Sequence, residues 1–171
     1  LLMPDYSEKF EKMRVAGRLA SETLDMLTDN IKPGVTTEFI DKLGYEFIRD
    51  NGAYSAPLFY RGFKKSLCTS LNHVVCHGIP SDRILNEGDA INVDVTAIID
   101  EHYGDTSRMF CVGKTPVKVN NLIDATYESM MLAIQSLKPG LKLGDIGHTI
   151  QSFVEKKGFS VVRDFCGHGI S

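Results

Sequence analysis

Apolar positions in the first fifty residues follow the spacing of two helices. From Phe10 they recur at alternating steps of three and four, which is the period of one buried helical face. They are Phe10, Met13, Gly17, Ala20, Leu24, Leu27 and Ile31. Lys32-Pro33-Gly34 ends this helix, and Thr36 can cap a second one that Gly52 closes. The chain is therefore predicted to open with two helices.

The same pattern returns in the last third of the chain. A helical stripe ends at Lys138-Pro139-Gly140, which lies 106 residues after Lys32-Pro33-Gly34, and another helix follows it. The same offset superposes Ile40 on Ile146, Phe47 on Phe153, Ile48 on Val154 and Gly52 on Gly158. We interpret this pattern as an internal repeat, with a first half over about residues 8–113 and the start of a second half over residues 119–171.

Residues between the two helix pairs favour strands. Val, Ile, Tyr, Phe and Thr are frequent there, and Gly, Pro, Asn and Asp bound the segments. The predicted strands are residues 53–60, 67–76, 89–99 and 102–112, with 159–166 beginning the strands of the second half. This order predicts an α/β (α+β) fold in a single partial domain over residues 1–171. The counterpart of the strand pair at 89–112 would fall past Ser171, so the second half is expected to be incomplete.

Composition excludes several classes of protein. The 171 residues are 24% charged and 43% hydrophobic, with a net charge of -3 and no clustered basic run. These values are typical of soluble globular proteins and argue against a general nucleic-acid binder or a polybasic membrane surface. No apolar run is long enough for a bilayer span, and Asp5, Glu8 and Lys9 interrupt any signal-type segment. We expect a cytoplasmic protein, and we expect this sequence to be part of a longer chain.

The four cysteines do not form a recognisable cysteine motif. They are Cys68, Cys76, Cys111 and Cys166. None stands in a C-x-x-C pair, which argues against a structural zinc site or a redox dithiol. Reduced thiols are the prediction.

Asp94 stands inside an alternating strand, where aspartate is uncommon. A two-residue turn at Asp100-Glu101 would pair Thr96 with Asp105 and Asp94 with Ser107. Asp94 and Asp105 would then be diagonal neighbours on one face, with Cα atoms about 7–8 Å apart. Like charges so placed disfavour joint ionisation unless a cation lies between them, which indicates a divalent metal site. Two solvated aspartates, or one bound by neighbouring hydroxyl groups, are the alternative.

Two histidines stand in glycine-rich frames. His77 lies in Cys76-His77-Gly78-Ile79-Pro80 and His168 in Cys166-Gly167-His168-Gly169-Ile170. They are 91 residues apart rather than 106, so they are not copies of each other in the repeat. Glycine lets the backbone approach a ligand closely and leaves the imidazole uncrowded. Because the chain has no G-x-S-x-G elbow and no glycine-rich phosphate loop, a nucleophilic triad explains these residues less well.

Several segments together resemble type I bacterial methionine aminopeptidases. They are residues 11–17, 72–80, 88–96, 104–110 and 167–170. The resemblance covers essentially the whole chain. It implies the pita-bread fold, whose pseudo-twofold halves agree with the repeat. It also implies removal of the N-terminal methionine by metal-dependent hydrolysis of the first peptide bond.

The resemblance implies a site for two divalent metal ions, of Co, Mn, Fe or Zn. Asp94 would chelate one ion, Asp105 would bridge both, and His168 would bind the other. Two further glutamate ligands, one of them also a proton shuttle, and another active-site histidine would lie beyond Ser171. The 171-residue chain by itself is therefore expected to be inactive.

The resemblance also implies the residues that contact substrate. His77 would contact the peptide and steady the transition state as the catalytic histidine. The pocket for the methionine side chain would include Tyr60, Phe63 and Cys68. Pro57 and Arg61 differ from the Cys and His of many relatives, as Phe63 differs from their Tyr, so pocket details need not match.

Two other functions remain open from the sequence. Xaa-Pro peptidases and creatinase-type hydrolases share the fold, but they usually carry a large N-terminal domain and lack Cys-His-Gly-Ile-Pro at this place. A pita-bread binding module without catalysis typically loses metal ligands, which this chain keeps. The interpretation that we favour is a cytoplasmic monomer that acts on nascent polypeptides near the ribosome. We expect it to bind no specific nucleic acid and no membrane.

Overall fold

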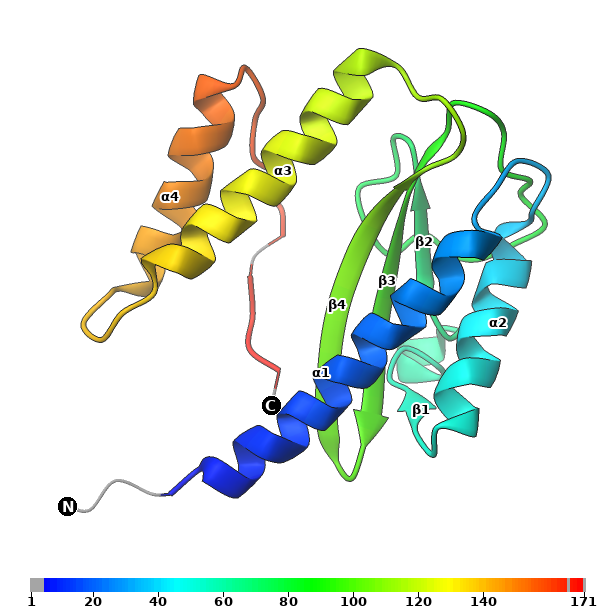
Figure 1. The fold of residues 1–171 in the computed structure, drawn as a ribbon, viewed down its shortest axis with the longest axis horizontal. Helices are drawn as coiled ribbons and strands as arrows, with labels where there is room; N and C mark the ends of the chain where they lie inside the picture. Colours follow the sequence, from blue (N-terminus) through cyan, green and yellow to red (C-terminus); the bar gives the residue numbers. More distant parts are fainter. Residues whose placement is uncertain (1–4, 166, 171) are drawn as a thin grey trace. The chain divides into compact units, whose positions relative to one another are not determined.

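The computed structural model describes residues 5–165 and 167–170 (Figure 1). These residues divide into two compact units, one of residues 5–115 with 169–170 and the other spanning Pro116–His168. Cys166, Ser171 and the opening Leu1-Leu2-Met3 lie outside the described residues. Among the helices of the described residues, none has the length and hydrophobicity to cross a membrane. The predicted half boundaries, 8–113 and 119–171, stay a prediction.

The first unit opens with the two predicted helices. Helix α1 spans Ser7–Leu27, a short 3-10 turn follows at Thr28–Asn30, and α2 spans Thr37–Asp50. The predicted cap of the second helix is confirmed, because the Phe39 amide donates to the Thr36 hydroxyl at 3.2 Å. A capping hydroxyl satisfies one of the amides that a helix leaves without a partner at its start.

The sheet is built around one long strand. β3 spans Ala90–Ile99, and the strands β1 (Tyr54–Ser55), β2 (Cys68–Leu71) and β4 (His102–Cys111) each pair with it in antiparallel fashion. β4 pairs with the whole length of β3, so β1 and β2 share the other edge of that strand. Every strand of this unit therefore takes its position from β3.

Two predicted strands are shorter than expected. The segment predicted at 53–60 is a strand only at Tyr54–Ser55, and the chain then turns into a 3-10 helix at Tyr60–Gly62. The segment predicted at 67–76 ends at Leu71, because Asn72 takes a left-handed backbone with φ 52 and begins a turn. Residues with β-propensity favour extended backbone, but only a hydrogen-bonding partner makes a strand.

The strand predicted at 159–166 is wrong for the residues that the structure describes. Residues 159–165 contain no strand, and Cys166 lies outside the described part of the chain. None of the described strands pairs with this segment. Its apolar composition alone therefore did not specify strand structure.

One face of the sheet makes the core of the first unit. β3 alternates buried and half-buried residues, and its Val93, Val95 and Ala97 lie fully buried on this face. α1 packs against β3 and β4, while α2 packs against β1 and β2, so both helices cover the same face (Figure 1). The helix backbone comes very close at Gly104, where an added Cβ would lie 2.1 Å from the Ala16 carbonyl oxygen.

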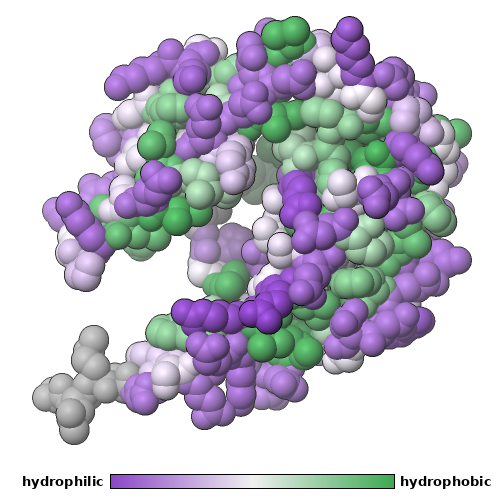
Figure 2. Space-filling model, in the orientation of Figure 1, coloured by the Kyte–Doolittle hydropathy of each residue, from purple (hydrophilic) through white to green (hydrophobic). Residues whose placement is uncertain are grey.

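The second unit is a pair of helices with a small core. α3 spans Val117–Ser136, and α4 spans Leu143–Lys156 and packs against it. Its buried apolar side chains in the described structure are Ala125, Ala133 and Val154. Several larger ones are exposed: Leu122, Met130, Leu132, Ile134, Leu137 and Leu143. Figure 2 accordingly shows hydrophobic surface between hydrophilic residues over these helices.

The two helix pairs have the same backbone at corresponding glycines. Gly34 and Gly140 take φ 89 and φ 90, and Gly52 and Gly158 take φ 75 and φ 82. All four are left-handed conformations that glycine adopts without steric cost, at helix boundaries where such residues are common. These matches agree with the 106-residue repeat.

The close approach of α1 to β4 predicts opposite effects for two neighbouring glycines. Gly104→Ala is expected to lower the free energy of unfolding by about 1–3 kcal/mol, since the new methyl group meets the Ala16 carbonyl and the backbone must shift. Gly17→Ala is the control, because Gly17 lies in α1 with nothing within 4 Å of an added Cβ. It should raise stability by about 0.5–1 kcal/mol. Urea unfolding measures both changes, and equal effects would contradict the packing described.

Candidate metal centre

Asp94 and Asp105 lie on the same face of the β3–β4 hairpin. The register pairs Asp94 with Ser107 and Thr96 with Asp105, as predicted from the sequence. Diagonal neighbours of this kind have Cα atoms about 7–8 Å apart. The predicted register is confirmed, and the two carboxylates lie on the sheet face opposite the helices.

The hairpin turn fixes this register. Ile99 pairs with His102, which leaves Asp100 and Glu101 as a two-residue loop. Both take left-handed backbones, with φ 48 and φ 64. Two positive φ values are typical of a type I′ turn, whose twist matches that of the flanking strands. A loop of this length allows one register, and the register places the two aspartates.

The surroundings of the pair suit a cation. Asp94 is half-buried and Asp105 is exposed. The register places these residues around them on the same face: Cys68, Ser70, Asn92, Thr96, Ser107 and Met109. None of these six side chains is basic. Carboxylates among uncharged neighbours at these strand positions fit divalent metal ions.

Cys68 lies directly beside Asp94 in the sheet. The two residues are a cross-strand pair of β2 and β3, and the thiol is 7% exposed. Burial raises the pKa of Cys68 to about 11, and the negative charges of Asp94, Asp41 and Asp105 act in the same direction. The thiol therefore stays protonated at neutral pH and offers an uncharged surface next to the aspartates.

His77 is exposed at the outer edge of β2. Its backbone is left-handed, with φ 55, which is uncommon for a residue with a side chain. The Thr69 amide donates to the Gly78 carbonyl at 2.8 Å, and the Gly78 amide donates to the Ser70 hydroxyl at 3.1 Å. An added Cβ at Gly78 would lie 2.2 Å from the Thr69 carbonyl oxygen. The glycine after His77 is thus required by the close approach of the two backbones.

The predicted pocket residues come from two different places in the first unit. Tyr60 is exposed in the 3-10 turn and Phe63 follows it half-buried, whereas Cys68 lies buried in β2. The Phe59 amide donates to the Phe63 carbonyl at 2.7 Å and closes the loop. The Arg61 guanidinium lies 5.3 Å from the centre of the Tyr60 ring, so one of the three residues that depart from the family pattern contacts a predicted pocket residue.

His168 is exposed in the segment after α4 and belongs to the second unit. Within the described ranges 5–165 and 167–170, no three His, Cys, Asp or Glu side chains gather closely enough to hold a metal ion. The structure therefore brings Asp94 and Asp105 together as a pair. The part of His168 in the site stays a prediction.

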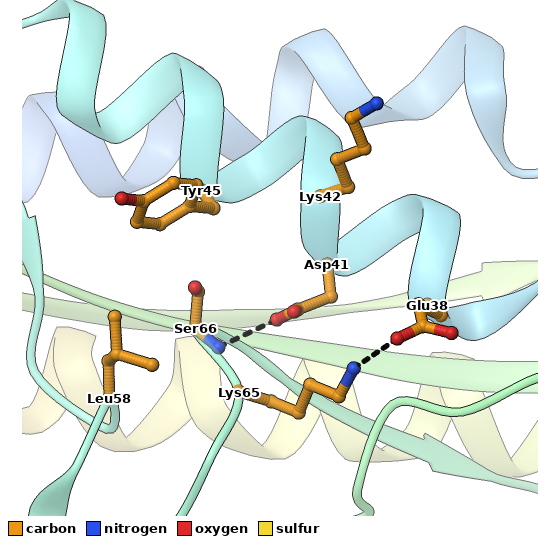
Figure 3. Close-up of a pocket in the computed structure, with 7 residues that line it drawn as sticks. All are labelled: Glu38, Asp41, Lys42, Tyr45, Leu58, Lys65 and Ser66. Atoms are coloured by element: carbon orange, nitrogen blue, oxygen red, sulfur yellow. Dashed lines mark hydrogen bonds and ion pairs between the residues drawn. The ribbon is translucent and has the colours of Figure 1, made fainter.

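Sequence reasoning missed Asp41, a buried carboxylate that contacts the residues directly before Cys68. It lies on α2 and lines an open depression of about 440 Å³, whose residues Figure 3 shows. Burial raises the pKa of Asp41, and hydrogen bonds from the Leu67 and Ser66 amides act against that rise. The sequence signal that could have indicated it is the position of this aspartate next to Ile40 in the apolar stripe of a helix.

Comparison with known proteins gives one family and a consistent set of relatives. Residues 11–171 match metallopeptidase family M24. The chain is 57% identical over 166 residues to methionine aminopeptidase from Rickettsia prowazekii, covering 96% of this chain and 64% of that protein. It is 52% identical over 165 residues to methionine aminopeptidase from Escherichia coli K12, covering 95% and 62%. The chain spans less than two thirds of these curated relatives.

Solved structures agree on the fold. The crystal structure of methionine aminopeptidase from Rickettsia prowazekii superposes with a TM-score of 0.96 at 54% identity, covering 99% of this chain and 68% of that one. An Xaa-Pro dipeptidase from Bacillus anthracis matches with a TM-score of 0.81 at 19% identity, covering 95% and 43%, which shows a shared fold alone. The predicted α/β pita-bread fold is confirmed.

The raised pKa predicts an order of thiol reactivity. At pH 8 in EDTA, iodoacetamide should alkylate exposed Cys111 readily and buried Cys68 far more slowly. A pKa of about 11 rather than 9.0 leaves about a hundredth of the thiolate, and the thiolate is the reactive form. Peptide mapping by mass spectrometry measures both rates, and urea should remove the difference. Equal rates in the folded chain would contradict the burial of Cys68.

Proposed function

Because the chain belongs to metallopeptidase family M24, we propose that it forms part of a methionyl aminopeptidase. The reaction is hydrolysis of the first peptide bond, which releases the N-terminal methionine from proteins and peptides. The observation that carries this proposal is that more than half of the aligned residues are identical in methionine aminopeptidases. Xaa-Pro peptidases share the fold at 16–21% identity, which does not favour their activity here.

Divalent metal ions are the cofactors that this family implies. We assign Asp94 to one of two ions, Asp105 to both as a bridge, and His168 to the other. Mn, Co, Fe and Zn all suit carboxylate and imidazole ligands. When bound, such ions would polarise the scissile carbonyl as Lewis acids and lower the pKa of a bound water molecule toward neutrality. The pair on the β3–β4 hairpin supports this assignment, because its face carries no basic residue at the positions in register.

His77 is assigned as the catalytic residue of this part of the chain. In that role it donates a hydrogen bond as negative charge develops on the carbonyl oxygen, or to the leaving amide nitrogen. Its rigid attachment supports the assignment, because hydrogen bonds on both sides of Gly78 hold the backbone at the edge of β2. A donor held in place before the reaction stabilises charge without first having to reorganise.

We assign Tyr60, Phe63 and Cys68 to the pocket that receives the methionine side chain. A buried thiol that stays protonated and two aromatic rings provide the apolar contacts that an unbranched thioether requires. Further ligands, which the resemblance gives as two glutamates and a histidine, would be supplied by sequence past Ser171. The protein would act in the cytoplasm as a monomer, on nascent chains near the ribosome.

The metal assignment predicts that replacing one carboxylate oxygen of Asp105 by an amide nitrogen reduces activity. In the whole protein, Asp105→Asn should reduce turnover of a Met-Ala peptide with added Mn by about a hundredfold or more, because a bridging carboxylate is lost. Bound metal, measured by mass spectrometry, should fall with it. Asp100→Asn is the control, since Asp100 is exposed at the tip of the same hairpin with φ 48, which Asn tolerates. Full turnover by Asp105→Asn would refute the assignment.

A second prediction concerns the 171-residue chain alone. It should bind Mn weakly in isothermal titration and show almost no peptidase activity, because its described residues bring together only two of the ligands required. The whole protein is the positive control. Tight binding of two ions by this chain would show that the ligand set needs nothing further.

A further inference from the structure

Three residues on one side of α2 contact the segment that directly precedes β2 in the chain. Glu38, Asp41 and Gly44 are spaced by three along the helix, so they lie on the same side of it. They meet three consecutive positions of the opposite segment, Lys65, Ser66 and Leu67. The contact therefore covers residues 65–67, which connect the loop that carries Tyr60 and Phe63 to strand β2.

Each of the three contacts is of a different kind. The Lys65 ammonium pairs with the Glu38 carboxylate, and the Asp41 carboxylate accepts a hydrogen bond from the Ser66 amide (Figure 3). Gly44 leaves room for Leu67, because an added Cβ there would lie 2.5 Å from the leucine Cδ1. The ion pair is partly exposed, so it contributes little.

Asp41 makes the strongest of these contacts. Its Oδ1 accepts hydrogen bonds from both the Ser66 amide at 2.7 Å and the Leu67 amide at 2.9 Å. The residue is 8% exposed. Hydrogen bonds to a charged acceptor are about twice as strong as neutral ones, and a buried carboxylate without such donors would be costly. One oxygen atom thus fixes two consecutive peptide groups.

The held segment joins the two parts of the proposed pocket. Upstream of it lies the loop with Tyr60 and Phe63, in which Phe59 and Arg61 have left-handed backbones with φ 69 and φ 47. Directly downstream lies Cys68, the cross-strand partner of Asp94. Movement at residues 66–67 would therefore shift the loop relative to the strand.

We propose that Asp41 is a positioning residue that sets the specificity of the substrate pocket by holding residues 66–67 between the pocket loop and Cys68. This inference rests on the proposed function. Asp94 and Asp105 stay in register through β3 and β4, which pair with each other along their whole length. Loss of the Asp41 acceptor should therefore disturb substrate fit and leave the metal pair intact.

The test compares variants of the whole protein on two peptides that differ only in the first residue, Met-Ala and Leu-Ala. Asp41→Ala should raise KM for the methionine peptide by about tenfold and reduce its preference over the leucine peptide, with kcat within about threefold and metal content unchanged. Asp41→Asn keeps a side-chain oxygen that can accept both amides but loses the charge that strengthens them, so its KM and its peptide preference should fall between those of the wild type and Asp41→Ala. Asp50→Ala is the matched control, because Asp50 is exposed on the same helix.

Hydrogen exchange gives a readout that does not depend on activity. The Ser66 and Leu67 amides should exchange at least about tenfold faster in Asp41→Ala than in the wild type or Asp50→Ala. If Asp41→Ala does not fold, Asp41→Glu replaces it, since the added methylene moves the acceptor oxygen while keeping its charge.

Two results would overturn the proposal. One is a folded variant with faster exchange at residues 66–67 but unchanged KM and unchanged preference between the peptides. The other is a fall in kcat and metal content without a change in KM, which would indicate a general structural role. If the wild-type whole protein cleaves neither peptide, the proposed function fails, while unchanged amide exchange would still refute the contact with Asp41.

Discussion

The register of the β3–β4 hairpin decides which side chains reach the open face of the sheet. Side chains alternate between the two faces of a strand, so a slip of one residue would turn Asp94 toward the helices and bring its apolar neighbours out. The two-residue loop at Asp100 and Glu101 excludes that slip. On the other face, α1 lies against Gly104 so closely that a side chain would not fit. The packing of the core and the position of the carboxylates therefore depend on the same pairing.

Much of this arrangement could be predicted from the sequence. The helices follow from the three-four spacing of apolar residues, which is a local property, and the Thr36 cap follows from the chemistry of its hydroxyl. The hairpin was predictable because its loop is short, so that turn and register specify each other. Asp94 could be identified as a candidate site residue because aspartate is uncommon in a strand, and its relation to Asp105 follows from the register.

The features that the sequence did not reveal depend on residues far apart in the chain. Residues 53–60 were predicted as a strand from β-propensity, yet only Tyr54–Ser55 has a partner on β3. The importance of Asp41 depends on amide groups 25 and 26 residues away, which no local pattern indicates. Whether His168 joins the two aspartates is likewise a question of tertiary structure.

The duplicated helix boundaries have a consequence for how such a chain can change over evolution. Gly34, Gly52, Gly140 and Gly158 hold backbone conformations that most other residues adopt only under strain, and they occur at equal places in both copies. Asp94 and Asp105 carry no such conformational requirement, because neither takes a positive φ. After a duplication, the chemistry of the two copies could therefore diverge freely while these four positions kept the shape of each helix pair.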